Sequence, residues 1–148
     1  MKNASGIAQL ILRLALGVGF ILPVMDRLGL MGPHGTAGVT WGDLSHFIDY
    51  TNTLVPFAGR PIAYAMGVLA TIAEAVFGIC LIIGFRIKEV ALGAGILTLV
   101  FGLCMGIFLS IAAPFNYPVF VFTGGALVLS GIEHYKWSVD SYIRNKSL

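Results

Sequence analysis

Four long apolar stretches, separated by polar segments, set the pattern of this chain. They cover residues 6–25, 61–85, 90–112 and 119–134 and contain very few ionisable side chains. Because about 20 apolar helical residues cross the hydrocarbon core of a bilayer, we interpret the stretches as membrane-spanning helices. The pattern predicts an all-α fold, an integral membrane four-helix bundle that forms a single domain over residues 1–148.

The polar segment between the first two stretches, residues 26–60, contains a second helical pattern. Thr40 and Asp43 have the spacing of a capping box, and an apolar face follows them. Trp41 and Tyr50 suit the membrane–water boundary. We therefore expect a short amphipathic helix on the bilayer surface in this first loop. Its predicted apolar face consists of Leu44, Phe47, Ile48, Thr51 and Val55.

Composition agrees with a membrane protein. The chain is 57% hydrophobic and 11% charged, with a mean hydropathy of +0.90, whereas soluble domains carry about 25% charged residues. A net charge of +2 is too small to indicate nucleic-acid binding, so the expected partner is the lipid bilayer. Cys80 and Cys104 lie at different depths, about 10 Å or more apart, which argues against a disulfide.

The basic residues predict the topology. With four spans, six of them lie on one side of the membrane and two, Arg27 and Arg60, on the other. The positive-inside rule then places both termini in the cytoplasm and the long first loop outside. The six are Lys2, Arg86, Lys88, Lys136, Arg144 and Lys146.

Small residues recur at every fourth position of the third stretch, which is typical of a helix-packing face. They are Ala94, Thr98, Gly102, Gly106 and Ser110. The same stripe offers a route to homo-oligomers through Gly102 and Gly106.

Arg13 and Glu74 are the first candidates for a site, because a charge deep in a membrane faces the protein interior, a partner charge or water. Their depths differ by about 4 Å, within reach of an arginine side chain. One interpretation is a buried ion pair that fixes the packing of the first two helices. Another is a polar site that holds a quinone head group, a small anion or a proton. A third has Arg13 reaching the cytoplasmic surface alone.

Further candidates lie at the outer boundary. Asp26 and Arg27 end the first stretch, where charges act as caps and anchors or line the mouth of a site. In the loop, Trp41, Asp43 and His46 are candidates. Asp43 and His46, with Asp49, have a spacing that aligns metal ligands on a helix. A solvated polar face has the same spacing and is the interpretation we favour, so no metal is assigned.

Several segments together resemble the DoxX family of small bacterial membrane proteins. They are Arg-Leu-Ala-Leu-Gly at 13–17, Glu74 followed by the basic turn at 81–86, Lys-Trp-Ser-Val-Asp at 136–140 and Asp-Arg-Leu-Gly at 26–29. The resemblance implies a four-helix bundle in a bacterial inner membrane. It aligns Arg13, Glu74 and Arg27 with charged residues of the family.

The resemblance also implies a link to redox systems, since the relative DoxD is a subunit of a thiosulfate:quinone oxidoreductase. Our leading hypothesis is a membrane subunit of a quinone-linked system, with a polar pocket between the first two helices, a quinone as the expected cofactor and a redox protein as partner. The alternatives are a non-enzymatic structural or assembly protein and a small transporter. Whether the protein is itself an enzyme stays open.

Overall fold

The chain folds into helices joined by short loops and one long one. The computed structural model describes residues 2–146, and no β-strand occurs among them. Ser5–Arg27, Gly59–Ile83 and Ile87–Phe108 are each long and apolar enough to cross a membrane. The all-α fold class is therefore confirmed, with three helices capable of spanning a bilayer. The helices are α1 (Lys2–Arg27), α2 (Leu44–Leu54), α3 (Gly59–Ile83), α4 (Ile87–Phe108), α5 (Ala113–Asn116), α6 (Val119–Ser130) and α7 (Val139–Lys146).

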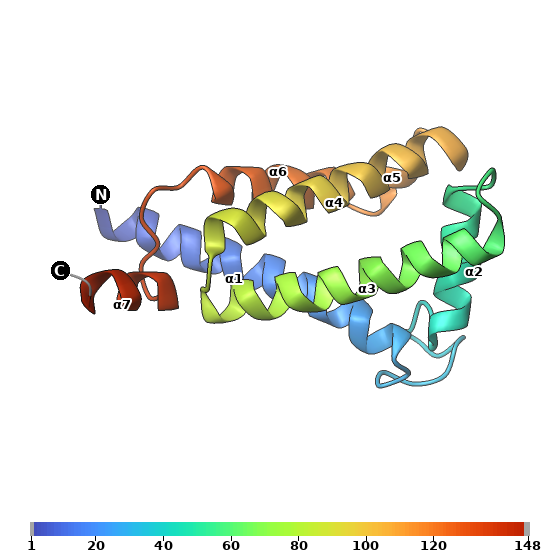
Figure 1. Ribbon diagram of the computed structural model, residues 1–148, viewed down its shortest axis with the longest axis horizontal. Helices are drawn as coiled ribbons and strands as arrows, with labels where there is room; N and C mark the ends of the chain where they lie inside the picture. The colour runs from blue at the N-terminus through green and yellow to red at the C-terminus, as the bar shows by residue number, and fades with distance from the viewer. Residues whose placement is uncertain (1, 147–148) are drawn as a thin grey trace.

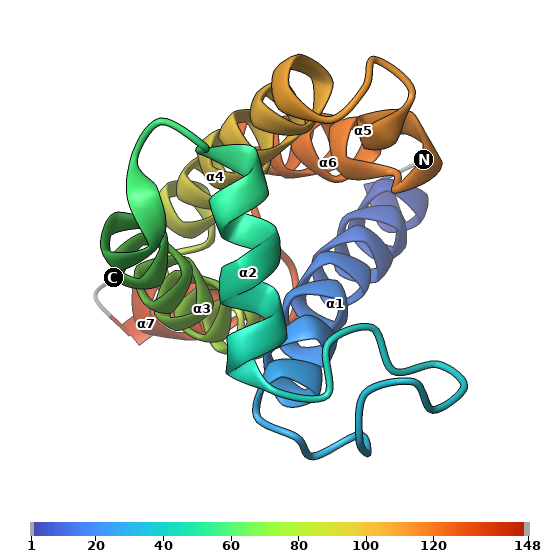
Figure 2. The same cartoon turned by 90° about the vertical axis from the view of Figure 1, so that its right-hand side faces the viewer.

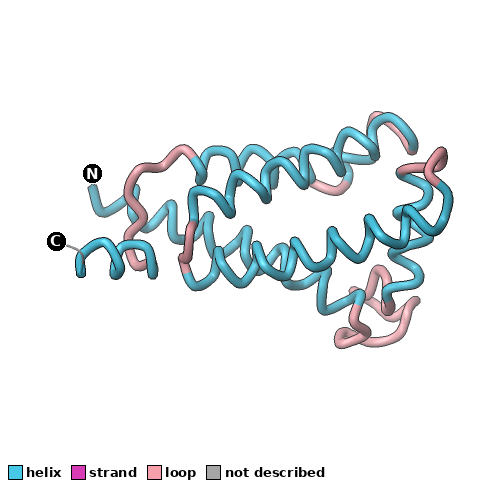
Figure 3. Tube along the Cα trace, in the orientation of Figure 1, coloured by secondary structure: helices cyan, strands magenta, loops and turns pink. Residues whose placement is uncertain are grey.

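The long helices run along one axis. α1, α3, α4 and α6 extend along the length of the molecule, and α2 lies across one end of them (Figure 1). Figure 2 looks onto that end, which we call the capped end. Both termini and α7 lie at the opposite end, the terminal end. Most of the loops gather at these two ends (Figure 3).

Apolar side chains cover the outside of the long helices. Ile11 is 62% exposed, Leu69 66%, Ile96 53% and Val121 73%. Large exposed apolar surfaces mark contact with a membrane or another protein. Helices whose backbone groups are satisfied internally are suited to a lipid surrounding, so this belt fits the acyl chains of a bilayer.

α1 and α3 cross with their backbones in contact. A Cβ added at Gly17 would lie 3.1 Å from the carbonyl oxygen of Gly78, and one added at Gly78 would lie 3.0 Å from that of Gly17. Glycines allow membrane helices to approach this closely. Because the helices run antiparallel (Figure 1), this contact fixes which residues of α1 and α3 lie at the same level.

The small residues of α4 face α6. A Cβ added at the buried Gly102 would lie 2.7 Å from the ring of Phe120. One turn away, the hydroxyl oxygens of Thr98 and Thr123 lie 2.9 Å apart. The predicted packing face is thus used within one chain. Association of copies through Gly102 and Gly106 stays a prediction.

A helix, α2, occupies the first loop as the pattern indicates, but it begins at a different cap. The N-cap is Asp43, whose carboxylate accepts a hydrogen bond of 2.9 Å from the His46 amide. The Thr40 amide instead donates to Asp26, at 2.9 Å, so Thr40 lies outside the helix. The position of α2 at a bilayer surface stays a prediction. Its buried residues are Phe47, Ile48, Thr51 and Leu54.

The last two apolar stretches form helices that end about four residues earlier than predicted. α4 ends at Phe108, not residue 112, and the short α5 with its buried Pro114 follows. α6 ends at Ser130, not residue 134, where the Ser130 hydroxyl donates to the Leu127 carbonyl at 2.7 Å. That bond occupies a carbonyl of the last turn. With 12 residues, α6 is about 18 Å long.

Residues 131–146 fold back over the terminal end, and we call them the C-terminal strap. The carboxylate of Asp140 accepts hydrogen bonds from the amides of Arg86, at 2.8 Å, and Ile87, at 2.9 Å. The Asp140 amide donates to the Gly84 carbonyl at 3.0 Å. The strap therefore caps the start of α4, where an anion also suits the helix dipole.

Candidate functional site

A cavity of about 460 Å³ lies among α1, α2, α3, α4 and α6 near the capped end. We call it the bundle cavity. Its volume is in the range of small-molecule sites, and its mixture of apolar walls and a few polar groups is typical of them. The polar groups include Arg27, Glu74 and Thr98. Aromatic side chains form much of the remaining wall, among them Phe20, Trp41, Phe47, Tyr50, Phe101 and Phe122.

An ion pair between Arg27 and Glu74 forms one polar wall of the bundle cavity. Arg27 Nη1 lies 2.7 Å from Glu74 Oε2, and Nη2 lies 3.5 Å from Oε1. The side chains are 6% and 9% exposed. Arg27 Nη1 also donates to the Thr71 hydroxyl at 3.2 Å. The pair thus holds α1 against α3 and presents both charges to the cavity.

Glu74 pairs with Arg27 and not with Arg13, so the interpretation of Arg13 and Glu74 as a buried ion pair is wrong, and the register of the helices explains why. From the Gly17–Gly78 contact, Arg13 lies four residues toward the terminal end and Glu74 four residues toward the capped end. At 1.5 Å per residue their Cα atoms differ in level by about 12 Å, not about 4 Å. Arg27 lies nearer the capped end, and its side chain points back along α1 toward Glu74, as helical side chains do.

The Arg27 guanidinium keeps spare hydrogen-bonding capacity. It stacks on the Phe47 ring, with Cζ 3.5 Å from the ring centroid. Its Nη2 makes only a 3.5 Å contact with Glu74, too long to be a strong hydrogen bond, whereas its Nε, also without a partner within residues 2–146, is fully buried. Guanidinium groups carry five N–H donors and no acceptor. The Arg27 guanidinium can therefore donate a hydrogen bond to an oxygen of a bound molecule while Glu74 still compensates its positive charge.

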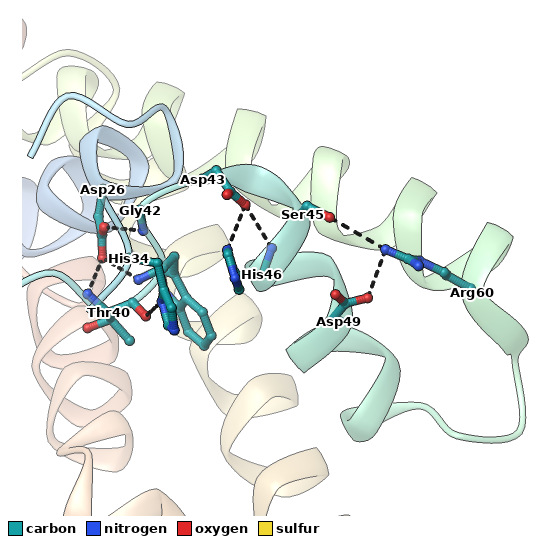
Figure 4. A network of polar contacts seen from close by, with 10 residues as sticks. Asp26, His34, Thr40, Gly42, Asp43, Ser45, His46, Asp49 and Arg60 are labelled. Carbon is teal, nitrogen blue, oxygen red and sulfur yellow. Dashed lines mark hydrogen bonds and ion pairs between the residues drawn. The ribbon is translucent and has the colours of Figure 1, made fainter. Parts of the chain in front are cut away.

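Asp26 ties the first loop to the end of α1. Its carboxylate accepts hydrogen bonds from the backbone amides of Thr40 at 2.9 Å, Trp41 at 3.0 Å and Gly42 at 2.9 Å (Figure 4). Gly42 has φ of +70°, and an added Cβ would collide with the backbone of His34. The arrangement requires glycine there and holds Trp41 against the bundle cavity.

The loop candidates lie outside this cavity, apart from Trp41. His46 Nδ1 is 3.0 Å from Asp43 Oδ1, and its ring stacks on His34 with centroids 4.1 Å apart. Asp49 pairs with Arg60 at 2.9 Å instead (Figure 4). The backbone hydrogen bond from His46 holds the pKa of Asp43 below its usual value. Across residues 2–146, no three His, Cys, Asp or Glu side chains are grouped to hold a metal ion.

Arg13 lies at the terminal end and binds the C-terminal strap. It is 2% exposed, and its Nη2 donates to the Trp137 carbonyl at 2.8 Å. Nearby, Gln9 Nε2 donates to the Lys136 carbonyl at 3.1 Å. Arg13 therefore neither pairs with Glu74 nor reaches the surface alone. Of the four charged candidates, Asp26, Arg27 and Glu74 line the bundle cavity, and Arg13 does not.

Sequence reasoning missed several residues of the cavity, notably Tyr50 as a lining residue, Thr98 and Tyr117. Thr98 was visible only as a member of the small-residue stripe. Burial, with Tyr117 nearby, raises the pKa of Tyr50, so its hydroxyl stays protonated at neutral pH. Tyr117 follows the break at α5, and no periodic pattern marks it as facing α2.

Comparison with known proteins adds no assignment. No protein-family model matches the chain, and neither a curated protein nor a solved structure matches it. The functional argument therefore rests on the geometry of the bundle cavity.

Proposed function

We propose that this protein is a membrane-embedded binding subunit that takes a quinone into the bundle cavity, against the Arg27–Glu74 pair. The observation that carries the proposal is the position of this buried pair. It lies in the wall of an aromatic cavity of about 460 Å³, and the Nη2 of Arg27 makes only a 3.5 Å contact with Glu74. A quinone offers carbonyl oxygens to such donors and a flat ring to aromatic walls.

The proposed setting is a bacterial inner membrane. α1, α3 and α4 cross it, the shorter α6 completes a four-helix bundle, and α2 lies at the outer surface with both termini in the cytoplasm. Leu22, 46% exposed, and Tyr117, 61% exposed, line the cavity on its outer side. A lipid-soluble ligand reaches the cavity there from the bilayer, between α1 and the turn before α6.

Membership of the DoxX family is part of this proposal. The Asp26-Arg27 pair and Glu74, two of the motifs that carry the resemblance, come together at the bundle cavity. We therefore assign the protein a binding role beside a redox protein partner, which carries out the electron transfer.

A structural role is the second candidate, and one observation favours it. Arg27 and Glu74 compensate each other's charge and join α1 to α3, which buried pairs do in proteins that bind nothing. The two candidates differ in what the cavity contains.

Mass spectrometry of small molecules extracted from the gently purified protein separates them. We expect wild type to retain a quinone and Glu74→Gln to retain at least about tenfold less, because loss of a charge-assisted hydrogen bond weakens the site. Asp49→Asn, which breaks the exposed pair with Arg60, is the matched control and should retain as much as wild type. Bilayer lipid alone in all three samples would reject quinone binding and favour the structural role.

A further inference from the structure

The bundle cavity has a second polar wall, opposite in character to the ion pair. Thr98 of α4 lines it, and the Thr98 hydroxyl oxygen lies 2.9 Å from that of Thr123 on α6. Both hydroxyls are uncharged, whereas the first wall carries a guanidinium. Between the two walls the lining is largely aromatic, and Phe20 and Phe122 meet edge to face with centroids 6.0 Å apart.

The two polar walls lie at nearly the same level in the bundle. Counted from the turn between α3 and α4, Glu74 is ten residues before Gly84 and Thr98 is twelve residues after Arg86. At 1.5 Å per residue the levels differ by about 3 Å. A molecule lying across the cavity therefore meets both walls at once.

The Thr98 hydroxyl can donate to a ligand without leaving another polar group unpaired. Its proton has a choice of acceptors, since its oxygen lies 3.0 Å from the Ala94 carbonyl and 3.2 Å from the Gly95 carbonyl. Thr123 also has the Val119 carbonyl at 3.1 Å. If Thr98 donates to a ligand, its oxygen still accepts the Thr123 proton. A hydroxyl carries one donor and two lone pairs, so every group stays satisfied.

We infer that the bundle cavity selects a flat ring with hydrogen-bond-accepting oxygens at two opposite edges, one bound by Arg27 and the other by the hydroxyl of Thr98. This rests on the proposed function and adds a residue that binds the second oxygen of the quinone, a contact that molecules with one polar end, such as fatty acids, cannot make. Thr98 is the residue that distinguishes them. Thr123 lies behind Thr98 and does not touch the ligand.

Quenching of tryptophan fluorescence tests the inference. The chain has two tryptophans, so Trp137→Phe leaves Trp41, in the cavity wall, as the sole reporter. One probe is tetramethyl-1,4-benzoquinone, which has no open ring position to react with thiols. The other is 2,3,5,6-tetramethylbenzaldehyde, which has a single carbonyl oxygen. Both are titrated into the detergent-solubilised protein.

We expect Thr98→Val to raise the Kd of the quinone about three- to tenfold, the effect of losing one hydrogen bond, and to change that of the aldehyde less than about twofold. Thr98→Ser restores the hydroxyl and should restore the wild-type Kd. Thr123→Val, the matched control, should change the quinone Kd less than about twofold.

Two sets of outcomes are distinguishable. Quinone binding that depends on Arg27 and Glu74 but is equal in wild type and Thr98→Val would overturn the inference and leave the proposed function standing. An equal loss in Thr123→Val would also overturn it, because packing would then account for the effect. Wild type that fails to bind the quinone, or binds it as well after Arg27→Met with Glu74→Leu, would overturn the proposed function as well.

Discussion

The buried pair of Arg27 and Glu74 makes a strong prediction about stability. Arg27→Met alone leaves the Glu74 carboxylate, whose side chain is 9% exposed, without its counter-charge. Removing one partner of a buried pair costs about 3–5 kcal/mol. Glu74→Leu leaves a guanidinium that still has the Thr71 hydroxyl and the Phe47 ring, so we expect the lower end of that range.

The double variant should recover most of the loss. Methionine and leucine fill the space with apolar groups, and replacing a whole buried pair in this way is often neutral. The contact with Phe47 is not recovered, which leaves a cost of about 1–2 kcal/mol. The coupling energy between the two positions should therefore be at least about 3 kcal/mol.

Unfolding of the purified protein by SDS in mixed micelles, followed by helical circular dichroism, measures the four free energies of this cycle. The matched control is the exposed pair of Arg60 and Asp49, whose side chains are 62% and 58% exposed. There the coupling should be at most about 1 kcal/mol. A coupling between Arg27 and Glu74 no larger than this control would refute the assignment of a buried, mutually dependent pair.

Three further predictions concern packing, the strap and pH. Gly78→Ala should lower the free energy of unfolding by about 1–3 kcal/mol through overpacking. Gly124→Ala should leave it unchanged, because no atom lies within 4 Å of the added Cβ. Unfolding of both variants by SDS measures the difference. Asp140→Ala removes the cap on α4 and should speed tryptic cleavage after Lys136, observed by mass spectrometry. The pKa of Asp43 is lowered in the folded protein, so the ionised carboxylate stabilises α2. This stabilisation is complete above the ordinary carboxyl pKa and is lost as the pH falls through the lowered pKa, where Asp43 becomes protonated. Hydrogen exchange in the first turn of α2, corrected for intrinsic rates, should therefore rise at acid pH in wild type but not in Asp43→Asn.

The helices were predictable from the sequence because their signals are local. Apolar runs and a 3.6-residue period indicated α1, α3, α4 and α2 to within a few residues. The end of α6 was not, because Gly131 and Ile132 carry no charge to mark the end of the helix and the turn depends on a side-chain hydrogen bond from Ser130 to Leu127. A hydropathy pattern does not record where a hydroxyl turns back to a carbonyl.

The composition of the site was partly predictable, but its pairing was not. A charge inside an apolar stretch marked Glu74 as a candidate, since such charges are costly in a membrane, and the charged end of the first stretch marked Arg27; the structure brings these two together. Choosing between Arg13 and Arg27 required the register of α1 against α3, which the Gly17–Gly78 contact sets. One turn of slip along this contact moves each arginine by about 5.4 Å relative to Glu74. Sequence periodicity fixes the face of each helix and leaves that slip undetermined.

The two buried arginines of α1, Arg13 and Arg27, have different surroundings. They are 14 residues apart, close to four helical turns, so they lie on nearly the same face of α1. Around Arg13, the C-terminal strap closes over the guanidinium, and the Trp137 carbonyl receives its hydrogen bond. Around Arg27, the Phe47 ring of α2 stacks on the guanidinium, and the other aromatic side chains of α2 and the first loop line a cavity of about 460 Å³ beside the ion pair. The C-terminal strap therefore covers one buried arginine, whereas the other lies in the wall of a cavity, as the proposed quinone site requires.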